Sequence, residues 1–176
     1  MPLKTPICTF DAKTGILCGK CESRLRSGQI TQADVDVSKA LVKLAERVGE
    51  LNRVTLLRSF EEGGSYLLEF EPQDIQVLRS SPEISARLEE ALHGRVWIVG
   101  ASNSERRFLE DLFYPLRVLT VNTVWLPDGS KVTKVVVPGR RTARYASDIE
   151  KLRSLVRKVK GIELMVESER EAMLRS

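Results

Sequence analysis

Three cysteines and one aspartate near the start of the chain have types and spacing that suit a metal ion. Cys18 and Cys21 form a Cys-x-x-Cys pair, and Cys8 and Asp11 have the same spacing with a carboxylate in the last place. A structural zinc site takes four ligands, most often thiolates and imidazoles, with carboxylate oxygen as a weaker substitute. The pattern therefore predicts a Zn²⁺ site formed by Cys8, Asp11, Cys18 and Cys21, on a small ribbon with Gly15 at its tip.

Other uses of these cysteines stay open at the level of sequence. A Cys-x-x-Cys pair can be a redox pair, but no βαβ pattern of the thioredoxin type surrounds this one. Two of the thiols could also form a disulfide, which intracellular proteins of hyperthermophiles contain. The composition, rich in Arg, Lys and Glu and poor in Asn and Gln, resembles that of a thermophile. Buried thiols without a metal are the third alternative.

A second group of residues is basic and lies in the C-terminal third. Arg117 to Lys160 carries eleven Lys and Arg against three acids, a net charge of +8 over 44 residues. This stretch also shows the apolar patterns of strands and a helix, so the charge is expected on a folded scaffold. The commonest partner of such a surface is a polyanion, with an acidic protein as the alternative. The candidate RNA-binding residues are Lys131, Lys134, Arg140, Arg141, Arg144, Lys151, Arg153, Arg157 and Lys158.

The charge is unevenly distributed along the 176 residues. Residues 1–30 carry +3, residues 31–100 carry −4 and residues 101–176 carry +5, which together give the net charge of +4. This asymmetry predicts modules with different surfaces. No segment approaches the run of about 18 apolar residues that a membrane span needs, and the first residues lack the apolar core of a signal peptide. We therefore expect a cytoplasmic protein with no membrane contact.

The elements that would position these residues follow the same order twice. Hydrophobic periodicity and turn signals predict helix, strand, strand, helix and strand over 31–101, and again over 102–168. In the second region the elements include a strand over 115–125, an Asp-Gly turn, a strand over 131–137, a basic loop over 138–144 and a helix over 145–159. The expected domains are a Cys-rich segment (1–30), an acidic unit (31–101), a basic unit (102–168) and a charged tail (169–176).

This duplicated order resembles the tandem KH domains, of the bacterial type II fold, found in the transcription factor NusA and its archaeal relatives. The second unit carries the closer match. Phe113 to Val118 resembles the start of the final KH domain of NusA, Val135 to Pro138 resembles its second strand and the proline after it, and Lys151 to Leu164 resembles its helix and last strand. In the first unit, Glu83 to Val99 resembles the equivalent helix and strand.

The resemblance implies an α+β fold and a non-enzymatic, RNA-binding factor that acts with RNA polymerase in transcription elongation or termination. One feature departs from the family. RNA-binding KH domains have a Gly-x-x-Gly loop between two helices, but residues 79–82 and 147–150 occupy that place here and contain no glycine. The alternative function is a protein-interaction adaptor that kept the KH scaffold and lost its grip on nucleic acid. No Ser, His or acidic pattern in the sequence predicts a catalytic site.

Overall fold

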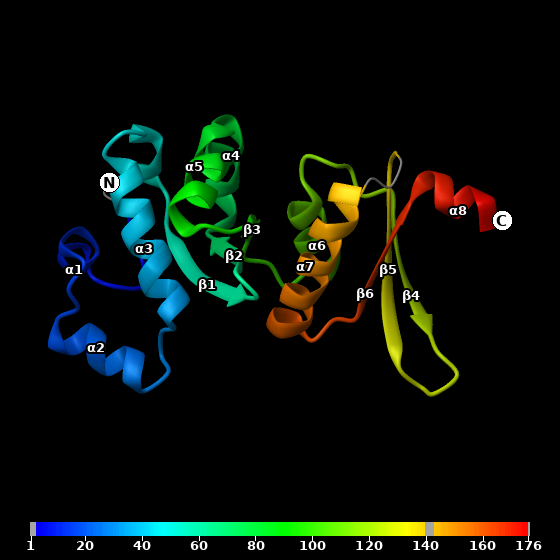
Figure 1. The fold of residues 1–176 in the computed structure, drawn as a ribbon, viewed down its shortest axis with the longest axis horizontal. Helices are drawn as coiled ribbons and strands as arrows, with labels where there is room; N and C mark the ends of the chain where they lie inside the picture. Colours follow the sequence, from blue (N-terminus) through cyan, green and yellow to red (C-terminus); the bar gives the residue numbers. More distant parts are fainter. Residues whose placement is uncertain (1–2, 140–142, 176) are drawn as a thin grey trace. The chain divides into compact units, whose positions relative to one another are not determined.

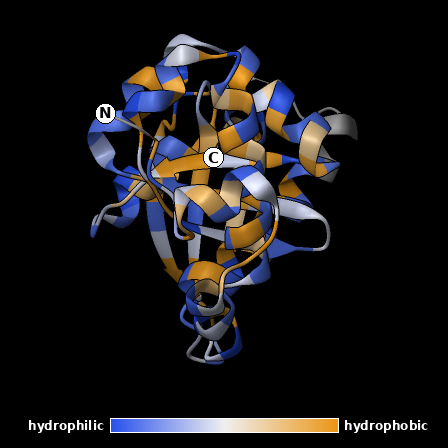
Figure 2. Cartoon of the chain, turned by 90° about the vertical axis from the view of Figure 1, so that its left-hand side faces the viewer, coloured by the Kyte–Doolittle hydropathy of each residue, from blue (hydrophilic) through white to orange (hydrophobic). Residues whose placement is uncertain are grey.

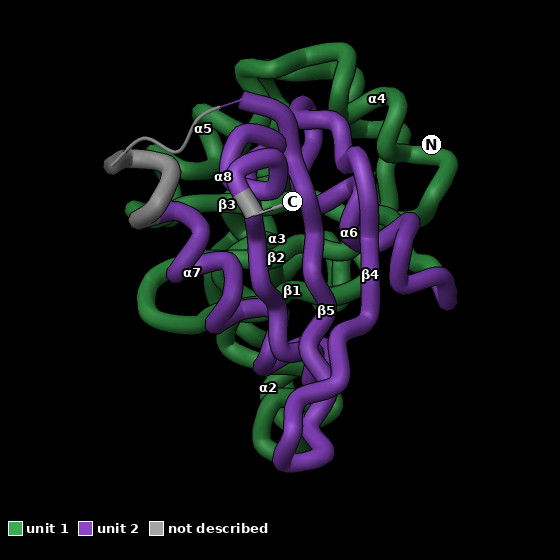
Figure 3. The backbone as a smooth tube through the Cα atoms, turned by 90° about the vertical axis from the view of Figure 1, so that its right-hand side faces the viewer, with its two compact units in different colours: residues 1–102 green, residues 103–176 purple. Residues whose placement is uncertain are grey.

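The chain folds into two compact units that divide between residues 102 and 103. The computed structural model describes the backbone of residues 3–139 and 143–175, and the side chains of 3–139 and 148–174. Figure 1 shows the elements in chain order, and Figure 3 colours the two units separately. Each unit contains helices and one three-stranded sheet, which confirms the expected α+β class.

Unit 1 begins with two short helices and continues with a longer helix, a hairpin, a broken helix and a third strand. Its elements are α1 (Thr9–Thr14), α2 (Gly19–Arg26), α3 (Gln32–Ala45), η1 (Gly49–Arg53), β1 (Leu56–Glu62), β2 (Ser65–Phe70), η2 (Pro72–Asp74), α4 (Ile75–Ser80), α5 (Glu83–Leu92) and β3 (Val96–Gly100). Strand β2 lies in the centre of the sheet, antiparallel to β1 and parallel to β3. A parallel pair needs a crossover, and α4 and α5 supply it.

Helix α3 is fixed at its N-terminus by a capping box. The Thr31 side chain accepts a hydrogen bond from the Asp34 N–H at 3.2 Å, and an Asp34 carboxylate oxygen accepts one from the Thr31 N–H at 2.9 Å. The other oxygen of Asp34 accepts from the Ser59 N–H of β1 at 2.6 Å. One buried carboxylate therefore starts the helix and attaches it to the sheet.

The first 30 residues belong to the core of unit 1. Leu3, Ile7, Ala12 and Cys21 are buried in the same hydrophobic cluster as α3 and the sheet. Lys4 forms a bridge to Thr55, with backbone hydrogen bonds of 3.2 Å to Val54 and 2.9 Å from Leu56. The Cys-rich segment therefore packs into the core of unit 1 through these side chains, and the backbone hydrogen bonds of Lys4 also attach it to that unit.

Unit 2 repeats the order of helix, two strands, helix and strand, and adds a C-terminal helix. Its elements are α6 (Glu105–Phe113), β4 (Thr120–Trp125), β5 (Lys131–Val137), α7 (Ala143–Lys160), β6 (Leu164–Ser168) and α8 (Glu169–Arg175). Strand β5 is central, antiparallel to β4 and parallel to β6. The core contains Leu109 of α6, Val135 and Val137 of β5, and Leu155 and Val156 of α7, each fully buried.

The helices of both units are amphipathic. Figure 2 shows hydrophobic and hydrophilic colours alternating along the helical ribbons, as expected where one face packs on a sheet and the other meets water. Helix α8 starts with a second capping box, because Ser168 and Glu171 bond reciprocally to each other's N–H at 3.4 and 3.2 Å. No helix in the described part of the chain is long and apolar enough to cross a membrane.

Two sequence-based details are wrong. The Cys-rich segment forms two short helices in place of a ribbon, and Gly15 ends α1 with a φ of +79° while its N–H bonds to the Asp11 carbonyl. Residues 9–14 lack the alternation of a strand, and their buried members, Asp11 and Ala12, are consecutive. The strand expected to start at Pro115 starts at Thr120, because the Leu116 N–H bonds back to Phe113.

Candidate metal centre and basic surface

The four candidate metal ligands occupy equivalent positions at the starts of two helices. Cys8 is the N-cap of α1 and Asp11 lies three residues later, while Cys18 is the N-cap of α2 and Cys21 lies three residues later. In an α-helix the N-cap and the third helical residue lie on the same side of the first turn, which is why capping boxes form there. Each helix therefore presents two ligands together, and Cys21 has the same relation to Cys18 as Asp11 has to Cys8.

The ligand atoms of the cluster are within reach of one ion. One atom from each of Cys8, Asp11, Cys18 and Cys21 can be chosen so that all four lie within 4.8 Å of one another. A tetrahedral zinc site, with Zn–S near 2.3 Å, places its sulfur ligands about 3.8 Å apart. All three cysteines are free thiols, so the disulfide considered from sequence does not form here. The expected clustering of these four residues is confirmed.

Asp11 provides the clearest sign of a cation. Its side chain is fully buried, and its Oδ2 accepts a hydrogen bond from the Cys18 N–H at 2.9 Å. Its Oδ1 is buried without a hydrogen-bond partner. The Cys18 N–H, helped by the nearby Cys21 and Cys18 thiols, holds the pKa of Asp11 well below its usual range. A buried, ionised carboxylate oxygen without a donor is costly unless a cation sits beside it.

Cys21 differs from the two N-cap cysteines in its exposure. Its side chain is buried, whereas Cys8 and Cys18 are exposed. Burial raises the pKa of the Cys21 thiol to about 12. A metal must displace this proton, because the thiolate and not the thiol is the ligand. The donor set of three sulfurs and one oxygen fits Zn²⁺, and the exposed edge of the site gives the ion a route from solvent.

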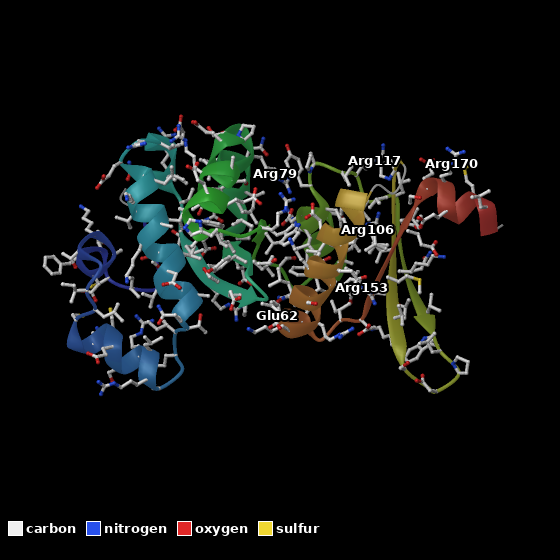
Figure 4. The ribbon with its side chains drawn as sticks, in the orientation of Figure 1. Glu62, Arg79, Arg106, Arg117, Arg153 and Arg170 are labelled. Atoms are coloured by element: carbon white, nitrogen blue, oxygen red, sulfur yellow. The ribbon has the colours of Figure 1, made fainter. Side chains whose placement is uncertain are left out.

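The basic residues of unit 2 fall into two groups according to their partners. Lys131, Lys151 and Lys158 are exposed, and Lys131 and Lys151 form no ion pair with a described residue. Lys134 lies 3.0 Å from the buried Glu167. Arg153, labelled on α7 in Figure 4, lies 2.9 Å from Glu150 and 3.6 Å from Glu163.

Glu163 is the residue that sequence reasoning missed. It lies just beyond the basic stretch and accepts two hydrogen bonds from Arg157, at 2.9 and 2.6 Å. The Arg157 hydrogen bonds lower the pKa of Glu163, with a smaller contribution from the Arg153 charge. Its spacing of six from Arg157 matches no helical pair, and the turn after α7 brings it back, so no local pattern in the sequence indicated the contact.

Three more candidates lie in the part of the chain where side chains are not described. Arg140 and Arg141 lie outside the described residues, and only the backbone of Arg144 is described, in the first turn of α7. Residues 147–150, which take the place of the Gly-x-x-Gly loop, lie inside the continuous helix α7. In unit 1 the corresponding place is a real break, where Ser81 separates α4 from α5.

Comparison with known proteins finds similar solved structures, including that of the protein APE1850. No family model matches the chain, and no curated protein matches it. The crystal structure of the protein APE1850 is 17% identical over 74% of this chain and 96% of that chain, with a TM-score of 0.46. A likeness at this level carries no argument about function.

Proposed function

We propose that this protein is a non-enzymatic RNA-binding factor of the NusA type, which acts with RNA polymerase in transcription elongation or termination. The observation that carries the proposal is a group of exposed lysines on a folded α+β unit with a strong excess of positive charge. Lys131 projects from β5, and Lys151 and Lys158 from α7. Phosphate contacts by such residues supply most of the affinity in binding without sequence specificity.

The arrangement of elements supports assignment of both units to the type II KH fold. Each unit has a helix, an antiparallel hairpin, a helical crossover and a third strand parallel to the second. A KH domain holds its nucleotides at the helix that follows the interhelical loop. In unit 2 the equivalent helix is α7, which carries the exposed Lys151, Lys158 and Lys160.

We also propose that Cys8, Asp11, Cys18 and Cys21 hold a structural Zn²⁺. The support is the combination of four convergent ligands and the orphaned Asp11 Oδ1 in a buried site. When bound, the ion would neutralise the carboxylate and the thiolates, and it would fix α1 against α2. Short helices of six and eight residues have little stability of their own, so an ion bound between them would order them.

A second candidate function has its own observation. Arg153 and Arg157 are engaged by Glu150 and Glu163, and no glycine lies between α4 and α5 in unit 1. Both features weaken the phosphate contacts by which an ordinary KH domain binds RNA. They favour a protein-interaction adaptor, in which the α7 face would meet an acidic partner protein.

A salt titration with unstructured RNA tests the main proposal. Replacing Lys131, Lys151 and Lys158 with Ala is expected to weaken binding at moderate salt and to reduce the slope of log K against log salt by up to about three. The same is expected for the Arg140, Arg141 and Arg144 triple variant. A matched control replaces Lys43, Arg47 and Arg53, which are exposed residues of unit 1, and it should leave the slope unchanged.

Two outcomes would decide against the proposal. If the unmodified protein does not bind RNA at low salt, the adaptor becomes the better account. If the control triple variant loses as much affinity as the unit 2 variants, the RNA-binding surface is not on unit 2.

A further inference from the structure

We propose that the metal-site segment is a second contact surface for single-stranded RNA, with Phe10 stacking on a base and with Lys13 and Lys20 holding phosphates. This inference rests on the proposed RNA-binding function and adds a separate site in unit 1. Its residues belong to α1 and to the first turn of α2, the two helices that carry the metal ligands.

The first observation is an exposed aromatic ring on a short helix of which only Asp11 and Ala12 are buried. Phe10 is 72% exposed, while the next two residues of α1, Asp11 and Ala12, are buried. Ile16, in the loop that connects α1 to α2, is 75% exposed. Both large apolar side chains are thus open to water and accessible to a ligand.

The second observation is the charge around these side chains. Lys13 lies three residues after Phe10 and therefore on the same face of α1, and Lys20 lies between Cys18 and Cys21. Both lysines are exposed, and neither forms an ion pair with a described residue. The acids of the segment are engaged elsewhere, because Asp11 is buried in the cluster and Glu22 pairs with Arg26 at 2.6 Å.

The third observation is that the proposed contact residues lie within the segment that forms the metal-site cluster. Phe10 lies between the ligands Cys8 and Asp11, and Lys20 lies between the ligands Cys18 and Cys21. The Arg24 guanidinium donates to the Pro6 carbonyl at 2.7 Å, which ties α2 to the chain just before α1. The backbone that carries the ring and the two ammonium groups is therefore held in place by other contacts. This lowers the conformational entropy lost on binding.

An exposed aromatic ring in a segment with two exposed lysines, and with no free acid among its described residues, fits single-stranded RNA better than a protein. Every base offers a face on which an aromatic ring can stack, and the phosphates match the lysines.

The test measures affinity for an unstructured single-stranded RNA with the full, zinc-loaded chain. Phe10→Ala is expected to lower affinity at least about fivefold, while Phe10→Tyr keeps affinity near that of the unmodified protein, because a ring of similar size can still stack. Lys13→Ala with Lys20→Ala should reduce the salt slope by up to about two. Leu174→Ala, which removes a side chain that is 80% exposed on α8, is the control for lost apolar surface and should have no effect.

The outcomes separate this inference from the proposed function. If the unmodified protein binds RNA and Phe10→Ala binds equally well, this inference is overturned while the proposed function stands. Equal loss from Phe10→Ala and Phe10→Tyr would also overturn it, because stacking would not be the contact. If the variants keep their RNA affinity but lose binding to an acidic protein, the surface serves a protein partner and the inference fails. If the unmodified protein binds no RNA, both the proposed function and this inference are wrong.

Discussion

The two units share an order of elements, but their candidate functional residues lie on different elements. Unit 1 has a larger core, into which the Cys-rich segment packs, and its candidate site is a compact cluster of metal ligands. Unit 2 has no comparable cluster among its described residues, and its candidate site is a spread of charge over α7 and β5. The candidate metal site therefore lies in the segment that unit 1 adds before the shared order of elements, while the basic surface of unit 2 lies on the shared elements.

The crossover between the second and third strands shows the difference most directly. In unit 1 it is divided into α4 and α5 at Ser81, with Pro82 at the start of the second helix. Proline lacks an N–H and restricts the residue before it, so the break is expected. In unit 2 the crossover is one helix of 18 residues, because no proline or glycine interrupts 143–160. A long helix presents its charged residues as a continuous stripe.

Both sheets nevertheless contain the same kind of polar contact. Arg58 of β1 lies 3.0 Å from the buried Glu69 of β2, and Lys134 of β5 lies 3.0 Å from the buried Glu167 of β6. A buried glutamate needs a partner, and in each sheet the neighbouring strand supplies it. Lys134 thus has a structural role in unit 2, and its contribution to RNA binding is expected to be smaller than that of Lys151.

The largest expected effect concerns the metal cluster of unit 1. Cys21→Ser should abolish the proposed zinc, from about one ion per chain to none by elemental analysis, and lower the thermal stability of unit 1 strongly. The structure of unit 2, followed by amide signals from β5 and α7, should stay unchanged. Lys20→Ala, between the same two cysteines, is the matched control and should keep the ion. Metal-free protein with the stability of the unmodified chain would contradict the assignment.

An intermediate effect is expected from a glycine substitution in each of the two crossovers. Ser154 is exposed in the middle of α7, and Ser81 lies in the break between α4 and α5. Ser154→Gly should lower the free energy of unfolding by about 0.5–1 kcal/mol relative to Ser154→Ala, because glycine loses more backbone entropy in a helix. Ser81→Gly relative to Ser81→Ala should cost much less. Equal costs in urea denaturation would mean that the helix is not continuous in solution.

The smallest effect is expected from releasing the paired arginines of unit 2. Glu163→Gln removes the charge that engages Arg153 and Arg157, so RNA affinity should rise, by about twofold or more at low salt. The pKa of Glu163 is lowered in the folded state, so its small contribution to stability is present above about pH 4.5 and lost as pH falls further. Glu163→Gln should therefore flatten the stability profile below that pH. An unchanged or weaker affinity for RNA would show that these arginines do not contact it.

The sequence by itself predicted the features that depend on neighbours along the chain. Apolar periodicity predicted most helices and strands, and Lys131–Val137 matches the expected strand residue for residue. The spacing of Cys8, Asp11, Cys18 and Cys21 predicted their convergence, since each half of the cluster is a local turn.

Tertiary structure determined the contacts between residues that are far apart in the sequence. Glu163 engages two arginines of α7 only because the chain turns back after Gly161, whose φ is +66°. The Cys-rich segment is helical and anchored in unit 1 because Leu3, Ile7, Ala12 and Cys21 find a shared apolar core, and local propensity did not reveal that core. Folding also shifted two pKa values in opposite directions: hydrogen bonds, the one from the Cys18 N–H first, lower the pKa of Asp11, whereas burial raises the pKa of the Cys21 thiol.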